Sequence, residues 1–76
     1  MEHKVVVGKY SYTLRDSAYS RGHEYEVLHH YSTKKAVAKR MADKLKKRTG
    51  NSFILKKYPA NETKSGAPFL YVVCGR

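Results

Sequence analysis

The alternation of apolar and polar residues along the chain predicts four β-strands and one α-helix. Period-two alternation with β-branched and aromatic residues indicates strands, and apolar residues three and four positions apart indicate a helix. The strands are expected at residues 4–14, 24–31, 52–58 and 69–74, and the helix follows the second strand. Turn-forming residues place loops at 15–23 and 59–68. The predicted order of elements is therefore β-β-α-β-β.

The same alternation assigns a face to each strand residue. In the first strand, one face carries Val6, Tyr10, Tyr12 and Leu14, and the other carries Val5 and Val7. Gly8 within this run suggests a bulge or the close approach of another backbone. In the second strand, the more apolar face, which is expected to point toward the core, carries Tyr25, Val27, His29 and Tyr31.

The helix is the clearest element of the pattern. It is expected to start at a cap formed by Ser32 and to end at about residue 48 or 49, with Gly50 as the left-handed residue that follows. Its apolar stripe consists of Val37, Ala38, Met41, Ala42 and Leu45. A stripe of this kind packs on a sheet, while the opposite side of the helix faces water.

The predicted fold class is α+β, with a single domain over residues 1–76. A four-stranded, mainly antiparallel sheet would carry the amphipathic helix packed on one face. The second face would stay open to solvent, to a ligand or to a second copy of the chain. Such a face, or an unpaired edge strand, would allow a homodimer.

Composition narrows the class of protein. The chain has 76 residues, and its single cysteine, Cys74, excludes a disulfide framework. No stretch approaches the roughly 20 apolar residues of a membrane span, and the first residues lack the pattern of a signal peptide. We therefore expect a cytoplasmic domain, in the host cytoplasm if the protein is viral, that does not bind a membrane.

Charge is the strongest functional signal in the sequence. Sixteen Lys and Arg against six Asp and Glu give a formal net charge of +10. Residues 33–48 hold eight of the basic side chains and one acid, Asp43. Like charges one helical turn apart repel, so a sequence that keeps them suits a polyanionic partner. The cations expected to bind this partner are Lys35, Lys39, Arg40, Lys44, Lys46 and Lys47, with Arg15, Arg21, Lys56 and Lys57 as extensions.

The residue types on the helix favour contact with phosphates over reading of bases. Lysine outnumbers arginine there, and an ammonium group lacks the planar fork that recognises guanine edges. The helix also has no Asn or Gln to recognise adenine. The primary interpretation is therefore a non-enzymatic protein that binds the backbone of DNA or RNA with little sequence preference.

Other kinds of site have weaker signals. His29 and His30 are adjacent on a strand and point to opposite faces, so we expect neither a metal site nor a cofactor. The carboxylates are scattered and Cys74 has no evident His–Asp partners, so no catalytic residue is assigned. A small basic ribonuclease acting through His, Tyr and Arg is a third interpretation. The seven tyrosines suit either sheet packing or the stacking of unpaired bases on an open sheet face.

Part of the chain, about residues 24–58, resembles small phage-encoded proteins built from a sheet and one helix. The resemblance is carried by Tyr25-Glu26-Val27, Ser32-Thr33-Lys34-Lys35-Ala36, Lys39-Arg40-Met41-Ala42 and Phe53-Ile54-Leu55. Similar proteins include anti-CRISPR proteins and phage inhibitors of host enzymes. The resemblance implies an alternative function: an inhibitor whose basic surface binds an acidic or nucleic-acid-processing host protein, such as a CRISPR effector or a polymerase. It transfers no site residue.

Overall fold

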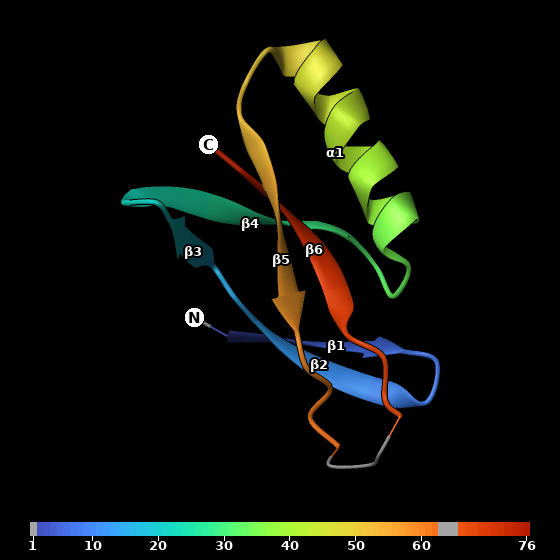
Figure 1. Cartoon of the computed structure of the whole chain (residues 1–76). Coiled ribbons are helices and arrows are strands. Elements are labelled where there is room, and N and C mark those ends of the chain that lie inside the picture. The colour runs from blue at the N-terminus through green and yellow to red at the C-terminus, as the bar shows by residue number, and fades with distance from the viewer. Residues whose placement is uncertain (1, 63–65) are drawn as a thin grey trace.

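The computed structural model describes residues 2–62 and 66–76, which form two antiparallel sheets and one helix (Figure 1). The predicted α+β class, with a four-stranded antiparallel sheet and one helix, is confirmed. The elements are β1 (Glu2–Val7), β2 (Tyr10–Arg15), β3 (Ser17–Ser20), β4 (His23–Ser32), α1 (Lys35–Thr49), β5 (Phe53–Tyr58) and β6 (Leu70–Gly75).

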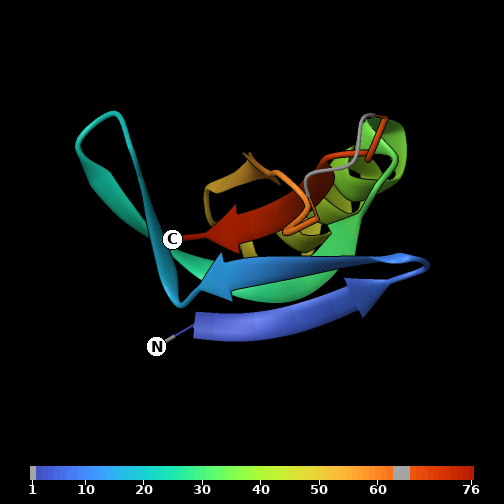
Figure 2. The same ribbon diagram turned by 90° about the horizontal axis from the view of Figure 1, so that it is seen from below.

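The larger sheet has the strand order β3-β4-β6-β5, and every pair of neighbours is antiparallel. One of its faces carries Leu28 and Phe53, which lie beside Leu45 of α1. The opposite face carries Leu70 and Val72, whose side chains form the buried core with β2. The sheet therefore lies between the helix and the β1–β2 hairpin, and Figure 2 shows these two elements on different sides of β6.

The hairpin covers the sheet face that the sequence was expected to leave open. Tyr12 and Leu14 of β2 are fully buried against Leu70 and Val72. The hydroxyl of Tyr12 donates a hydrogen bond to the carbonyl of Pro68 at 2.7 Å, so its polar end is satisfied. The expectation of an open face is wrong. Residues 4–14, which were predicted to be one strand of this sheet, instead form a hairpin that packs on the sheet as a separate layer.

The predicted strand 4–14 is wrong as a single element, because it is divided by a two-residue turn. Gly8 has φ +62°, the left-handed region that a tight hairpin turn requires at this position. The turn places Val7 opposite Tyr10 and Val5 opposite Tyr12. Val5 and Val7 therefore share a face with the core tyrosines, and Val6 is 69% exposed. The faces predicted for Val5, Val6 and Val7 were therefore wrong. Across the two-residue turn, odd-numbered residues of β1 lie on the same face as even-numbered residues of β2.

The predicted loop 15–23 contains a further strand, β3, which pairs with the start of β4. Arg21 and Gly22 form the connecting turn, and both have positive φ, at 51° and 81°. A two-residue hairpin turn of type I′ requires this geometry at both central positions. The abundance of turn-forming residues concealed a strand of only four residues.

In β4, the predicted core face is confirmed at three of its four positions. Tyr25 is buried, and Val27 and Tyr31 pack against the core. His29 is exposed, although its ring lies on the hairpin side, where it meets the ring of His3 edge-on. The pairing of β4 with β6 shifts between Val27 and Tyr31, so Leu28, His29 and His30 lie opposite Val73 alone at a bulge.

The helix confirms its predicted stripe and its predicted end. Ala38 and Ala42 are buried, and the other three stripe residues are half-buried. Gly50 is left-handed at φ 74°, and its N–H donates to the Lys46 carbonyl at 2.8 Å. The predicted start is wrong: Lys34 occupies the cap position, and the hydroxyl of Ser32 instead accepts a hydrogen bond from the Lys34 N–H, within the preceding turn.

The segment after β5 binds the outer edge of β2. The N–H of Asn61 donates to the Ser11 carbonyl at 2.8 Å, and the carboxylate of Glu62 accepts from the Ser11 N–H and hydroxyl. The Ser11 N–H is the main reason that the pKa of Glu62 lies below its ordinary value. These bonds satisfy an edge of the hairpin that a second strand could otherwise extend.

Candidate functional site

The outer side of α1 presents several cations, spread over the half of the helix that faces away from the sheet. Because Ala38 and Ala42 pack on the sheet, the charged residues are turned toward solvent. All six that the sequence singled out are exposed: Lys35, Lys39, Arg40, Lys44, Lys46 and Lys47. We call these six residues the helix cations. Lys34 and Arg48, at the two ends of the helix, are exposed as well.

The helix cations lack a neutralising partner among the residues that the structure describes. In the part of the chain that the structure describes, none of them forms an ion pair. Asp43 is the one acid on the helix, and it stands one turn from both Lys39 and Lys47. The first turn of α1 contains no acid, and its last turn contains Lys46, Lys47 and Arg48. The helix cations therefore retain a positive field that is available to an external anion.

One flank of the helix borders a small hollow of about 170 Å³. Met41 and Leu45 provide its apolar residues, and Lys44, Arg48 and His30 provide its polar ones. His30 shares the strand face of Leu28, which borders the helix, and it therefore lies beside α1. Sequence reasoning considered His30 only as a metal ligand and missed this position, because alternation along a strand does not tell which face of the sheet the helix covers.

The four additional cations predicted from the sequence do not form one surface. Lys57 lies on the face of β5 that also carries Phe53, and its Nζ stands 4.5 Å from the centre of the Phe69 ring. Arg21 is exposed in the turn between β3 and β4. Arg15 and Lys56 come together on the other side of the sheet, away from α1.

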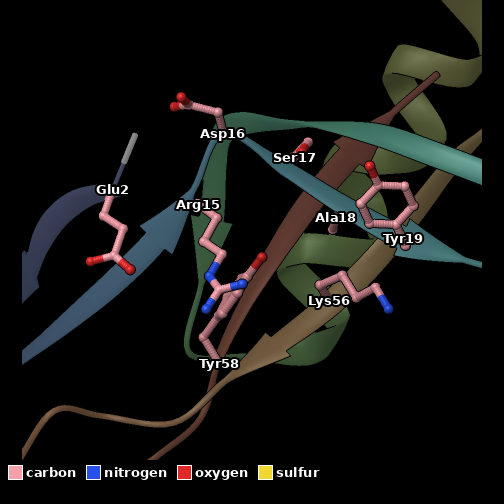
Figure 3. Close-up of a pocket in the computed structure, with 8 residues that line it drawn as sticks. All are labelled: Glu2, Arg15, Asp16, Ser17, Ala18, Tyr19, Lys56 and Tyr58. Carbon is pink, nitrogen blue, oxygen red and sulfur yellow. The ribbon is translucent and has the colours of Figure 1, made fainter.

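Arg15 and Lys56 line a second and larger hollow of about 630 Å³ (Figure 3). The hollow is formed by the end of β2, the strand β3 and the middle of β5, with Glu2 of β1 at its rim. Tyr58 and Tyr19 also line it. The sequence named both cations as extensions of the helix surface, and the fold separates them from the helix by the thickness of the sheet.

The surroundings of Cys74 and His3 show what these two reactive side chains contact. Cys74 is fully buried, and burial raises the pKa of its thiol to about 11, which keeps the thiol protonated. His3 lies 2.5 Å from a carboxylate oxygen of Asp16, and its ring meets the ring of His29 edge-on at 5.7 Å. Within residues 2–62 and 66–76, no three His, Cys, Asp or Glu side chains gather around a metal position.

The tyrosines do not form an open stacking surface. Tyr12 and Tyr25 are buried, and Tyr10, Tyr31 and Tyr58 are partly buried against the core. Tyr71 is half-buried on the other face of the sheet, opposite Lys57. Tyr19 is the exception, with 68% of its surface exposed and its hydroxyl donating to Glu24 at 2.9 Å. The packing interpretation is therefore confirmed for the five tyrosines that lie in or against the core.

Comparison with protein-family models, with curated proteins and with solved structures finds no match to this chain. In the described residues, α1 is neither long enough nor apolar enough to cross a membrane.

Proposed function

We propose that this protein binds the phosphate backbone of nucleic acids through the helix cations. The observation that carries the proposal is the placement of six exposed cations on one side of α1, with no ion pair among the described residues to neutralise them. Binding would release counterions condensed on the nucleic acid, which provides most of the affinity of non-specific binding.

The dimensions of the helix suit a phosphate backbone. Lys35 and Lys47 lie about 18 Å apart along the helix axis, at about 1.5 Å per residue. Phosphates follow one another at about 3.4 Å along one strand of a duplex, so the helix cations can meet several phosphates at once. The absence of Asn and Gln from α1 and its excess of lysine favour positioning on the backbone over sequence recognition.

Fluorescence anisotropy with labelled duplex and single-stranded oligonucleotides tests the proposal. We expect binding at low salt, and we expect Lys39→Glu/Arg40→Glu to abolish it. The matched control is Lys4→Glu/Lys9→Glu, which changes the formal charge equally at two exposed residues of the hairpin. Absence of binding by the unmodified chain, or equal loss in both double variants, contradicts the proposal.

The same variants distinguish a nucleic acid from a protein partner. After nuclease treatment of a lysate, loss of everything that co-purifies supports a nucleic acid. A stoichiometric acidic protein that survives the nuclease and is lost with Lys39→Glu/Arg40→Glu would instead show that the helix cations bind a protein. That outcome, together with the absence of oligonucleotide binding, would replace the proposal with the inhibitor interpretation.

A further inference from the structure

The small hollow on the flank of α1 gathers three basic side chains from two elements. Lys44 and Arg48 stand one turn apart on the helix, and His30 comes from β4. All three are exposed. None of the described residues that line this hollow is an acid, whereas Glu2 and Asp16 line the larger hollow on the other side of the sheet. An anion at the helix flank would therefore meet basic groups alone.

The surroundings of His30 leave its ring available to an external group. The charged side chains that face it from α1 are Lys44 and Arg48. From the sheet, β6 contributes Val73 and Tyr71 to the same face, and both side chains are uncharged. His30 takes part in no ion pair or hydrogen bond with the residues that the structure describes. A ligand would therefore not have to displace a partner of the imidazole.

Two acids lie near these groups in the sequence, and both stand outside the hollow. Glu26 shares the face of β4 that carries His30, but it lines a neighbouring hollow, together with Arg76. Asp43 precedes Lys44 on α1 and points about 100° away from it around the helix axis. The positive charge at the hollow is therefore kept for a group from outside the described chain.

The size and floor of the hollow restrict what it can hold. Its volume of about 170 Å³ lies below the range of about 300–1,000 Å³ that sites for larger organic ligands occupy. Half-buried Met41 and Leu45 form its apolar part. Guanidinium and ammonium groups bind phosphate oxygens through charge-assisted hydrogen bonds, and an imidazole donates an N–H in either protonation state. One phosphate group fits this combination of size and donors.

We propose that this hollow holds one phosphate of the nucleic-acid backbone, bound by His30, Lys44 and Arg48, and that protonation of His30 strengthens the binding. This inference rests on the function proposed for the helix cations, to which it adds Arg48 and a contact from β4. A neutral imidazole offers one N–H, whereas the imidazolium offers two and a positive charge. A phosphate therefore favours the protonated form, and affinity should rise as the pH falls through the range in which histidine changes charge.

His29 provides a matched comparison within the same strand. It is exposed like His30, but its ring lies on the hairpin side, edge-on to the ring of His3 at 5.7 Å. Loss of either imidazole changes the titratable charge of the chain equally, and only His30 borders α1. A pH effect that arises from overall charge should appear in both variants, and one that arises at the hollow should depend on His30 alone.

Fluorescence anisotropy with one labelled duplex at about pH 6 and about pH 8 tests the inference, since histidine changes charge between these values. A full phosphate contact is worth about eightfold in affinity for each tenfold fall in salt concentration. At about 100 mM salt, we therefore expect the unmodified chain to bind about fivefold more tightly at the lower pH. The slope of log K against log salt concentration should also be steeper there, by up to about 0.9.

Substitutions of the two histidines assign the effect. His30→Gln should remove the gain at low pH, and His29→Gln should retain it. His30→Lys, which carries a fixed charge, should bind tightly at both pH values. An equal gain in His30→Gln and the unmodified chain, loss of the gain in both glutamine variants, or weak binding of His30→Lys at the higher pH would overturn the inference.

Arg48→Gln tests the contribution of the helix to the same site. It should weaken binding by about fivefold at low pH, close to the value of one phosphate contact. The control is Arg76→Gln, because Arg76 is exposed and lines the neighbouring hollow instead. Equal losses in the two variants would contradict the placement of the phosphate.

The same measurements separate this inference from the function on which it rests. Binding at the higher pH that is lost in Lys39→Glu/Arg40→Glu supports the helix cations whatever the effect of pH. If that binding shows no gain at low pH, the phosphate site at His30 is refuted and the function proposed for the helix stands. Absence of binding at both pH values would refute both.

Discussion

The placement of charge on α1 makes a quantitative prediction about salt. The perturbation is Lys39→Gln/Arg40→Gln, which removes two exposed cations that have no ion pair among the described residues and leaves the buried stripe intact. Each phosphate contact contributes about −0.9 to the slope of log K against log salt concentration on B-DNA. Loss of two contacts should therefore reduce the magnitude of the slope by about 1.8.

This difference is large enough to measure. Between about 50 and 200 mM salt, the unmodified chain should lose about twelvefold more affinity than the variant. The assay is anisotropy with one labelled duplex at four or more salt concentrations, and the control is Lys4→Gln/Lys9→Gln, two exposed residues of the hairpin. An unchanged slope in the helix variant, or an equal change in the control, would refute the reasoning that the excess charge acts from the helix.

Three further predictions concern stability, and chemical or thermal denaturation checks each of them. Tyr12→Phe should lower the free energy of unfolding by about 1–2 kcal/mol, because it removes a buried hydrogen bond. Tyr19→Phe, at an exposed site, should lower it by less than about 0.5 kcal/mol. Equal losses would contradict the burial assigned to the two rings. Gly75→Ala should destabilise by about 1–3 kcal/mol, because its Cβ would lie 2.7 Å from the Phe53 ring, and an added Phe53→Leu should recover part of the loss; no recovery would locate the strain elsewhere. Glu62→Gln should lower the melting temperature near neutral pH. The difference from the unmodified chain should disappear as the pH falls through the pKa of Glu62, which lies below its ordinary value of 4.5. A difference that persists in acid would show that the charge of Glu62 is not responsible.

The helix could be predicted from the sequence because its signals are local. The spacing of Ala38 and Ala42 fixes the buried stripe. Gly50 ends the helix because glycine adopts the left-handed conformation without steric cost, whatever surrounds it. The exposure of the helix cations follows from the same periodicity, since a residue opposite a buried stripe faces solvent.

The strands at the start of the chain could not be predicted equally well. A turn of two residues at Gly8 reverses the parity of the alternation, so Val6 was placed with residues that are buried and is itself exposed. The bulge between Val27 and Tyr31 also depends on pairing with β6, a strand far away in the sequence. Alternation alone identifies strands but not the positions at which their register changes.

The sequence by itself determined the fold class, the helix and the side of the helix that carries the charge, because each depends on residues a few positions apart. Only the tertiary structure decided that the hairpin covers the second face of the sheet, and that Arg15 and Lys56 face one hollow away from α1. Both arrangements bring together segments that are distant along the chain. They depend on which apolar faces pack against each other in the folded protein. The net charge is therefore a property of the sequence, while its division between two separate surfaces is a property of the fold.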